Sequence, residues 1–233
     1  MKQLAALRAQ TGGGILATPE PHWFGRSSLL SGSWPSWLIT ASQFGEECHF
    51  SNGTMIDPSR GDLFILMNGC VNIYAEVLDS GSSGALVDFL GPGDLVARQR
   101  HTEFDFKYRV RGKATVLMIK QERIEAFSLA LKNLEAGLMA SEMHIVGKFA
   151  QAAASLLLPD TERLLRIAGS LASHPVSFRS QKGMEVHATK EEIRMYAGLM
   201  RRQAARAWAE LADAGVVVFD GYKRFFYNPA IRS

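Results

Sequence analysis

The sequence has few of the features that mark secreted, metal-binding or membrane-spanning proteins. Only two cysteines are present, Cys48 and Cys70, so neither a disulfide framework nor a closed zinc site is expected. Reduced thiols are the default in a cytoplasmic protein. The N-terminus lacks the pattern of a signal peptide, and no apolar run approaches the length of a membrane span. We therefore expect a cytoplasmic protein with no membrane segment.

Motifs of enzymes and of cofactor-binding proteins are missing as well. The sequence has no metal-ligand triad, no G-x-S-x-G motif and no glycine-rich phosphate loop. An iron–sulfur cluster needs about four cysteines, more than the chain contains. Haem could use His22, His49, His101 or a methionine, but a lone histidine is more often an ordinary polar or core residue. We expect neither an enzyme nor a protein with a metal or cofactor.

The composition is that of a folded protein. Hydrophobic residues make up 47% of 233 residues, which is enough for proper cores in one large or two ordinary domains. The formal net charge is only +3, and residues 175–233 carry the excess of Lys and Arg. A basic C-terminal region suits nucleic acid, although many basic tails bind none.

The stretch that the rest of the chain serves is 189–211, which predicts two short helices around a tight turn. Thr189 and Glu192 form an S/T-x-x-E capping box, so a helix starts at Lys190. Gly198 marks the turn, because glycine tolerates a positive φ. In the second helix, residues at i, i+3, i+4 and i+7 predict a buried face: Ala204, Ala207, Trp208 and Leu211.

Three arginines occupy the remaining surface of this second helix. Arg202 and Arg206 lie opposite the buried face at ~100° per residue, and Arg201 stands at the helix start. Such a helix fits the major groove of DNA, where arginine bonds bidentately to guanine O6 and N7. Gln203 belongs to the same candidate DNA surface. The alternative is that the arginines are exposed residues of a helix-turn-helix that never touches DNA.

A hairpin is expected after the second helix. Residues 216–219 read as a strand, Asp220-Gly221 as a two-residue turn and residues 223–227 as the return strand. This hairpin would be a wing. Lys223 and Arg224 lie near its tip, where they could contact phosphates.

Short apolar runs between turn signals fill residues 43–120. They predict about seven or eight strands at intervals of roughly 8–12 residues, as in a sandwich, barrel or jelly roll. Asn68-Gly69 reads as a hairpin turn within this region. Alternation places four cations on one sheet face, where they could hold an anion or form a solvated outer surface: Lys107, Arg109, Arg111 and Lys113.

The period becomes helical over 121–158. An apolar stripe runs along this segment at steps of three or four residues: Leu131, Leu134, Leu138, Ile145 and Phe149. A long helix with a narrow apolar seam predicts a two-fold dimer interface. The alternative is that the stripe packs on the β-domain of its own chain. Pro159 ends the helix, and Asp160 or Thr161 caps a further one.

Residues 1–42 are harder to interpret. A short helix could begin near Leu4, but a run of glycines breaks it, and the prolines predict an irregular segment. Trp23, Trp34 and Trp37 are expected to pack this segment onto the body of the protein.

The order of β-roll, long helix, helix-turn-helix and wing resembles the Crp/Fnr superfamily of bacterial transcription regulators. The resemblance covers roughly residues 43–230. In the β-roll it rests on NGTMI (52–56), LFILMNGCVNIY (63–74) and FLGPGDLV (89–96). Further along it rests on PDTERLLRIAGSLA (159–172) and ATKEEIRMYAGLMRRQAARAWAELADAGVV (188–217). Each piece is weak alone, but their order and spacing together are specific.

The resemblance implies an α+β fold with an N-terminal β-roll like that of cyclic-nucleotide-binding domains, a long dimerisation helix and a C-terminal winged helix-turn-helix. The β-roll would correspond to 43–120, the dimerisation helix to 121–158 and the winged helix-turn-helix to 159–233, and the irregular segment 1–42 precedes them. It also implies a homodimer on a two-fold symmetric site in double-stranded DNA, and contact with RNA polymerase if the protein is an activator. Base contacts would fall on Arg201, Arg202 and Arg206, and phosphate contacts on Thr189 and Lys190.

Two departures from the family pattern matter. A nucleotide-binding β-roll of the family has a Gly-Glu pair and then an Arg-Ser or Arg-Thr pair after the FLGPGD-like turn. Here Asp94 is followed by LVARQRHTEFDFKYRV, with neither pair, so control by cyclic AMP is not expected and the effector is unknown. Arg194 occupies a slot that is usually small, so the two helices would splay or the register would differ.

We therefore expect a sequence-specific transcription regulator. The alternative is a ligand-binding or protein-interaction β-roll protein whose helix-turn-helix no longer reads DNA, which Arg194 and the alanine-rich second helix support. A regulator without an effector, controlled by its own abundance, fits the sequence equally. A thiol switch at Cys48 or Cys70 is a further alternative, but cysteines in or beside apolar strands are usually inert.

Overall fold

The computed structural model describes residues 18, 20, 21, 24, 33–77, 85–97, 104–131, 133–173, 177–221 and 223–228. The helix expected near Leu4, together with His22, Trp23 and His101, lies outside these residues. The chain divides into two compact units, one formed by residues 1–85 with 89–148 and the other by 86–88 with 149–233.

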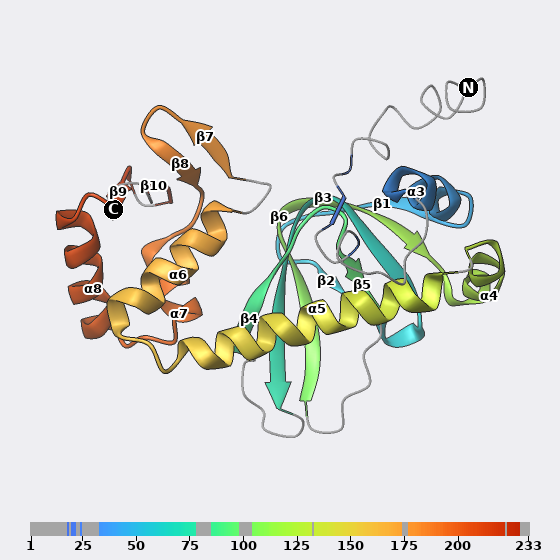
Figure 1. Cartoon of the computed structure of the whole chain (residues 1–233), viewed down its shortest axis with the longest axis horizontal. Coiled ribbons are helices and arrows are strands. Elements are labelled where there is room, and N and C mark those ends of the chain that lie inside the picture. Colours follow the sequence, from blue (N-terminus) through green and yellow to red (C-terminus); the bar gives the residue numbers. More distant parts are fainter. Residues whose placement is uncertain are drawn as a thin grey trace. The chain divides into compact units, whose positions relative to one another are not determined.

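The first unit is built on a six-stranded sheet whose described pairings are antiparallel (Figure 1). The central strands β3 and β6 pair from Leu63 opposite Ile119 to Val77 opposite Phe104. The order is β1-β6-β3-β4, with β2 paired to β6 and β5 to β3. The strands are β1 (Glu46–Phe50), β2 (Met55–Ile56), β3 (Leu63–Val77), β4 (Ala85–Leu90), β5 (Leu95–Val96) and β6 (Phe104–Ile119).

The predicted hairpin turn at Asn68-Gly69 is wrong, because β3 continues through these residues without reversing. The pairing with β6 shifts register on both sides of Asn68, as it does at a β-bulge. Gly69 has a φ of 94°, and a Cβ on it would lie 2.2 Å from the carbonyl oxygen of Lys113. The bulge, rather than a turn, therefore requires glycine here.

Helix α3 (Trp34–Ser42) occupies part of the segment that the prolines predicted to be irregular. The Ser33 hydroxyl caps it by accepting from the Ser36 N–H. Pro35 stands in the first turn, where a missing N–H costs no helical hydrogen bond. The stacked rings of Trp34 and Trp37, 5.3 Å apart, are buried in the core of the first unit, as expected.

Two helices follow the sheet where a single long one was expected. They are α4 (Gln121–Ala130) and α5 (Leu134–Ser155). Phe127 of α4 is fully buried and packs edge-on against Trp37, with ring centroids 5.8 Å apart. Helix α4 is thereby joined to α3 within the first unit (Figure 1).

The part of α5 in the first unit carries two rows of apolar side chains. Leu134 and Ile145 are each only 1% exposed, so these two residues of the predicted stripe pack within their own chain, whereas Phe149 of the same stripe is 37% exposed. Met139, Met143 and Val146, at i, i+4 and i+7, are 62%, 64% and 37% exposed. We call these three residues the exposed row of α5.

The second unit combines three helices with a small antiparallel sheet. Helix α6 (Asp160–Ala172) lies next to α7 (Lys190–Tyr196) and α8 (Arg201–Asp213) (Figure 1). Pro159, rather than Asp160 or Thr161, is its N-cap. The sheet order is β7-β8-β10-β9, and the strands are β7 (Phe178–Ser180), β8 (Gly183–Val186), β9 (Val217–Phe219) and β10 (Phe225–Tyr227).

The α+β prediction is confirmed: a β-rich unit precedes a long helix and a helical unit with a small sheet. Among the residues that the structure describes, no helix is long and apolar enough to cross a membrane. The same residues contain no cluster of His, Cys, Asp and Glu that could hold a metal ion.

Candidate nucleic-acid interface

Helix α7 begins where the capping box predicted. The backbone N–H of Glu192 donates to the Thr189 hydroxyl at 3.0 Å, and the N–H of Thr189 donates to the Glu192 carboxylate at 3.3 Å. Two otherwise unpaired donors are satisfied in this way. Lys190 follows as the first helical residue and is exposed.

The turn between α7 and α8 is a Schellman motif. Gly198 has a φ of 61° and donates its N–H to the Met195 carbonyl at 3.1 Å. The Leu199 N–H donates to the Arg194 carbonyl at the same distance. These are the two bonds that end a helix with a left-handed residue, so the predicted role of Gly198 is confirmed.

Helix α8 is held in the second unit by the face that its periodicity predicted. All four predicted residues are at most 5% exposed: Ala204, Ala207, Trp208 and Leu211. The Trp208 ring packs edge-on against Phe219, with centroids 5.0 Å apart. Arg202 and Arg206 are exposed and project from the opposite side of the helix. The helix therefore presents two guanidinium groups to solvent on a rigidly packed base.

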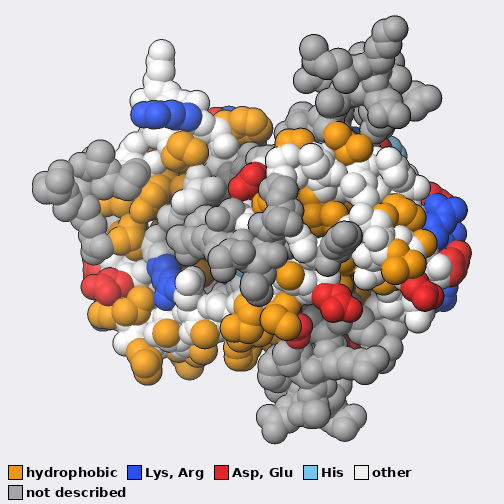
Figure 2. Space-filling view, turned by 45° about the vertical axis from the view of Figure 1, so that its right-hand side comes forward, with side chains coloured by type: hydrophobic (Ala, Val, Ile, Leu, Met, Phe, Trp, Pro, Cys, Tyr) orange, Lys and Arg blue, Asp and Glu red, His pale blue; other side chains and the backbone are white. Residues whose placement is uncertain are grey.

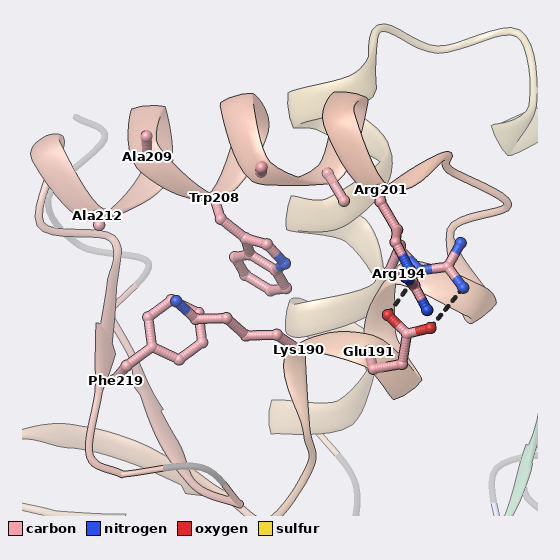
Figure 3. A pocket seen from close by; sticks show the side chains of 10 residues that line it. Lys190, Glu191, Arg194, Arg201, Trp208, Ala209, Ala212 and Phe219 are labelled. Atoms are coloured by element: carbon pink, nitrogen blue, oxygen red, sulfur yellow. Dashed lines mark hydrogen bonds and ion pairs between the residues drawn. The ribbon is translucent and has the colours of Figure 1, made fainter.

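Gln203 and Arg201 lie on the two flanks of α8. The Gln203 side-chain oxygen accepts from the Met200 N–H at 3.0 Å, and its amide donates to Asp160 at 3.4 Å. Gln203 thus caps the start of α8 and ties it to the first residue of α6. Arg201 is exposed on the other flank, beside Glu191 of α7 (Figure 3).

The loop that joins the two strands of the wing is longer than the sequence predicted. Phe219 pairs with Phe225, and the Asp220 N–H bonds the Arg224 carbonyl at 3.0 Å. The loop therefore spans residues 220–224 instead of a two-residue turn at Asp220-Gly221. Lys223 is exposed in this loop.

Arg224 is paired with two carboxylates of the second unit. It pairs with Glu185 at 3.2 Å and with Asp220. The hydrogen bond to Glu185 and the charge of Asp220 raise the pKa of Arg224. A phosphate contact from Arg224 would have to compete with both carboxylates, whereas Lys223 has its charge in open solvent.

A groove of ≈ 390 Å³ runs between α7, α8 and β9 (Figure 3). Alanines of α8 form one wall, and Trp208 and Phe219 form the apolar floor. The Lys190 ammonium lies 3.8 Å from the centroid of the Phe219 ring, in a cation–π contact. The charged residues that line the groove are Lys190, Glu191, Arg194 and Arg201.

Sequence reasoning missed Glu191 and misjudged Arg194. The Arg194 guanidinium pairs with both oxygens of the Glu191 carboxylate, at 2.8 and 2.7 Å. The i, i+3 spacing of the two residues was the available signal. The guanidinium is turned along α7 toward Glu191.

The Arg194 hydrogen bond lowers the pKa of Glu191 from its ordinary value of 4.5. A depressed folded-state pKa stabilises the fold above pH 4.5, and this contribution is lost as the pH falls through the lowered value. Arg194→Ala is therefore expected to move the Glu191 pKa back toward 4.5. A carbon-detected NMR titration of the side-chain carboxyl would measure this change. Arg166→Ala, on α6, should leave that pKa where it is.

The surroundings of both cysteines favour unreactive thiols over a thiol switch. Cys70 is 3% exposed. Burial raises the pKa of the Cys48 thiol, so this thiol is protonated at neutral pH and is a poor nucleophile.

The sequence matches no protein-family model and no curated protein sequence. Solved structures do resemble this one. CLP, described as the c-di-GMP-responsive global regulator of Xanthomonas campestris, is 19% identical, with a TM-score of 0.66 over 83% of this chain and 99% of its own. FixK2 from Bradyrhizobium japonicum is 16% identical, with a TM-score of 0.63 over 81% of this chain and 94% of its own.

A third match comes from Thermus thermophilus. TTHB099, described as a CRP-family transcriptional regulator, is 19% identical, with a TM-score of 0.59 over 77% of this chain and 91% of its own. TTHA1359, from the same organism and described as a CRP/FNR-family regulator, has a TM-score of 0.55. The resemblance inferred from the sequence motifs is thus confirmed for the fold: the chain is built as the transcription regulators of the CRP/FNR family are built.

Proposed function

We propose that the protein is a sequence-specific DNA-binding transcription regulator that acts as a homodimer. One observation carries the proposal. Helix α8 buries one face completely and exposes Arg202 and Arg206 on the other, directly after a tight turn. A short, rigidly held helix with two exposed guanidinium groups suits the major groove of DNA.

The surrounding residues support this orientation. Arg201 stands at the start of α8, so it enters the groove with the same end of the helix. Lys190 is exposed on α7 and Lys223 is exposed in the wing loop, where they would contact phosphates on either side. The Thr189 hydroxyl accepts the capping bond, and its own O–H remains able to donate to a phosphate. Phosphate contacts of this kind orient the protein, and base contacts specify the site.

The exposed row of α5 supports the homodimer. Two methionines and a valine at i, i+4 and i+7 form an apolar strip on a long helix. Figure 2 shows exposed hydrophobic side chains at several places on one face of the molecule. Such a strip, paired with its copy about a two-fold axis, makes a parallel helix pair. The two recognition helices would then enter successive major grooves, ~34 Å apart.

Replacing both Met139 and Met143 by glutamate is expected to dissociate the dimer. Four buried carboxylates at one interface cannot all be desolvated. We expect the self-association constant to fall at least about 100-fold, or roughly 3 kcal/mol, as measured by analytical ultracentrifugation. Glu135→Gln, at an exposed position on the same helix, is the control. An unchanged dimer in the double variant would place the interface elsewhere.

Regulation is part of the proposal only in outline. The sequence after Asp94 lacks the pairs that hold a cyclic nucleotide in the family, so we propose no cyclic AMP control. An unknown effector, or none, is consistent with this chain. Action in the cytoplasm, and contact with RNA polymerase in the case of activation, follow from the same proposal.

The proposal is tested by selecting bound genomic fragments with the purified protein, without added ligand, at two salt concentrations. We expect enrichment of a two-fold symmetric sequence that Arg202→Ala/Arg206→Ala abolishes. Arg60→Ala/Lys113→Ala, which removes the same charge from the β-rich unit, should leave the enrichment intact. Weak, salt-sensitive and sequence-blind binding by the wild type would favour a helix-turn-helix that no longer reads DNA.

A further inference from the structure

Arg194 joins helix α7 to the link before α8 through three hydrogen bonds. Two run to the Glu191 carboxylate at 2.8 and 2.7 Å, and the third runs from Nη1 to the carbonyl oxygen of Leu199 at 2.6 Å. Glu191 lies in the first turn of α7, and Leu199 lies in the link to α8. One side chain therefore connects the beginning of α7 with the backbone two residues before α8.

The connection closes a ring at Leu199. The N–H of Leu199 donates to the backbone carbonyl of Arg194 at 3.1 Å, while its own carbonyl accepts from the Arg194 side chain. Both backbone polar groups of Leu199 are thus bonded to the same residue. The Leu199 side chain is 2% exposed, so this residue has little freedom to move.

The ring lies at one end of the groove beside α8 (Figure 3). Arg194 is a half-buried side chain at 22% exposure, and Glu191 is 46% exposed. The charge of Arg201 also acts on the Glu191 carboxylate. The first arginine of α8 therefore stands beside an acidic group that Arg194 already neutralises.

We infer that Arg194 is a positioning residue for α8: by bonding Glu191 and the Leu199 carbonyl together, it sets where the recognition helix begins and how its arginines meet the bases. This inference rests on the proposed function. Three donors of the guanidinium are used inside the chain, so Arg194 acts through Arg202 and Arg206 and not through a base contact of its own. A small residue in this slot could not make the connection.

Two simpler roles must be separated from this one. Arg194 would be a mere charge partner if its loss mattered only because Glu191 then repelled DNA phosphates. It would be merely structural if its loss lowered stability without changing which sequences are bound. Positioning predicts a third result, a loss of discrimination between sequences that persists when the Glu191 charge is absent.

The experiment uses five full-length variants: Arg194→Ala, Arg194→Lys, Glu191→Gln, the double variant Glu191→Gln/Arg194→Ala, and Arg166→Ala as the control. Dissociation constants are measured for the selected symmetric site and for a scrambled duplex over a range of salt concentrations. Melting temperatures and hydrogen exchange of the Leu199 and Met200 amides are measured in the same buffers.

Arg194→Ala is expected to lower the ratio of specific to scrambled affinity about tenfold for each protomer, and so about 100-fold for the dimer, as expected for one charged hydrogen bond per protomer. The fall should persist in the double variant. The Leu199 and Met200 amides should exchange faster. Arg194→Lys keeps the positive charge but lacks the planar guanidinium that bonds two partners at once. Its affinity for the scrambled duplex should therefore equal that of the wild type, while its ratio of specific to scrambled affinity should stay as low as in Arg194→Ala. Arg166→Ala should change neither.

Three results would overturn the inference. In the first, the ratio recovers fully in the double variant, which leaves charge neutralisation as the only role. In the second, the melting temperature falls while the ratio and the amide exchange rates stay unchanged, which leaves a structural role. In the third, the wild type itself fails to discriminate between the two duplexes, and this result also removes the proposed function. The first two leave the proposed function standing.

Discussion

Arg206→Ala is expected to relax sequence discrimination at one symmetric pair of positions while leaving the fold intact. Each bidentate arginine–guanine pair contributes about 1–3 kcal/mol of discrimination, and a dimer loses it twice. The affinity for the symmetric site should therefore fall between about 30-fold and about 10⁴-fold. Arg206 is exposed, so its removal leaves no cavity. Competition binding against a panel of single-base variants would show the preference relaxing at one symmetric pair of positions.

Lys223→Ala is the matched comparison for this prediction. A lysine that contacts phosphate weakens binding to all sequences alike, and the slope of log K against log salt should decrease by about 0.9 for each protomer. Arg206→Ala should instead change the site preference. If the base preference of Arg206→Ala equalled that of the wild type, Arg206 would not read a base.

Trp208→Ala is expected to destabilise the second unit more than any exposed substitution. Trp208 is 5% exposed and packs on Phe219 and Phe225 at centroid distances of 5.0 and 6.5 Å. Truncating a buried aromatic side chain costs about 3–5 kcal/mol, a large part of the roughly 5–15 kcal/mol that a domain has. Urea unfolding followed by circular dichroism would measure the shift in the unfolding midpoint.

Trp208→Phe separates packing from other effects. It keeps a ring against Phe219 and should cost much less than the alanine variant, because the remaining cavity is smaller. Val218→Ala, on the exposed side of β9, should stay within about 0.5 kcal/mol of the wild type. A Trp208→Ala protein as stable as the wild type would mean that the Trp208 cluster does not hold α8 in place.

The helix-turn-helix could be predicted closely because its signals are local. Thr189 and Glu192 are three residues apart, Gly198 needs no partner to favour the turn, and the buried face of α8 follows from helical periodicity. The same holds for Arg202 and Arg206, since residues opposite a buried face are exposed. Their contact with DNA stays a prediction.

Features that depend on distant residues could not be predicted in this way. Asn68-Gly69 has the composition of a hairpin turn, but pairing with the whole length of β6 makes it a bulge. The apolar residues of α5 did not reveal which row faces its own sheet. Only one side of a helix can face the core, and in the folded chain this side carries Leu134 and Ile145. Met139 and Met143 are left exposed.

The sequence by itself determined the succession of a β-rich region, a long helical region and a helix-turn-helix, the two ends of α7, the start of α8 and the residues that α8 buries. Capping, glycine turns and helical periodicity depend only on residues that are close together in the sequence. Only the tertiary structure decided the roles of side chains whose partners are brought together by folding. It holds Arg224 between Glu185 and Asp220, closes Gln203 against α6, and directs Arg194 to Glu191 and Leu199. A charged side chain takes the partner that the fold places within reach, and no local pattern specifies that choice.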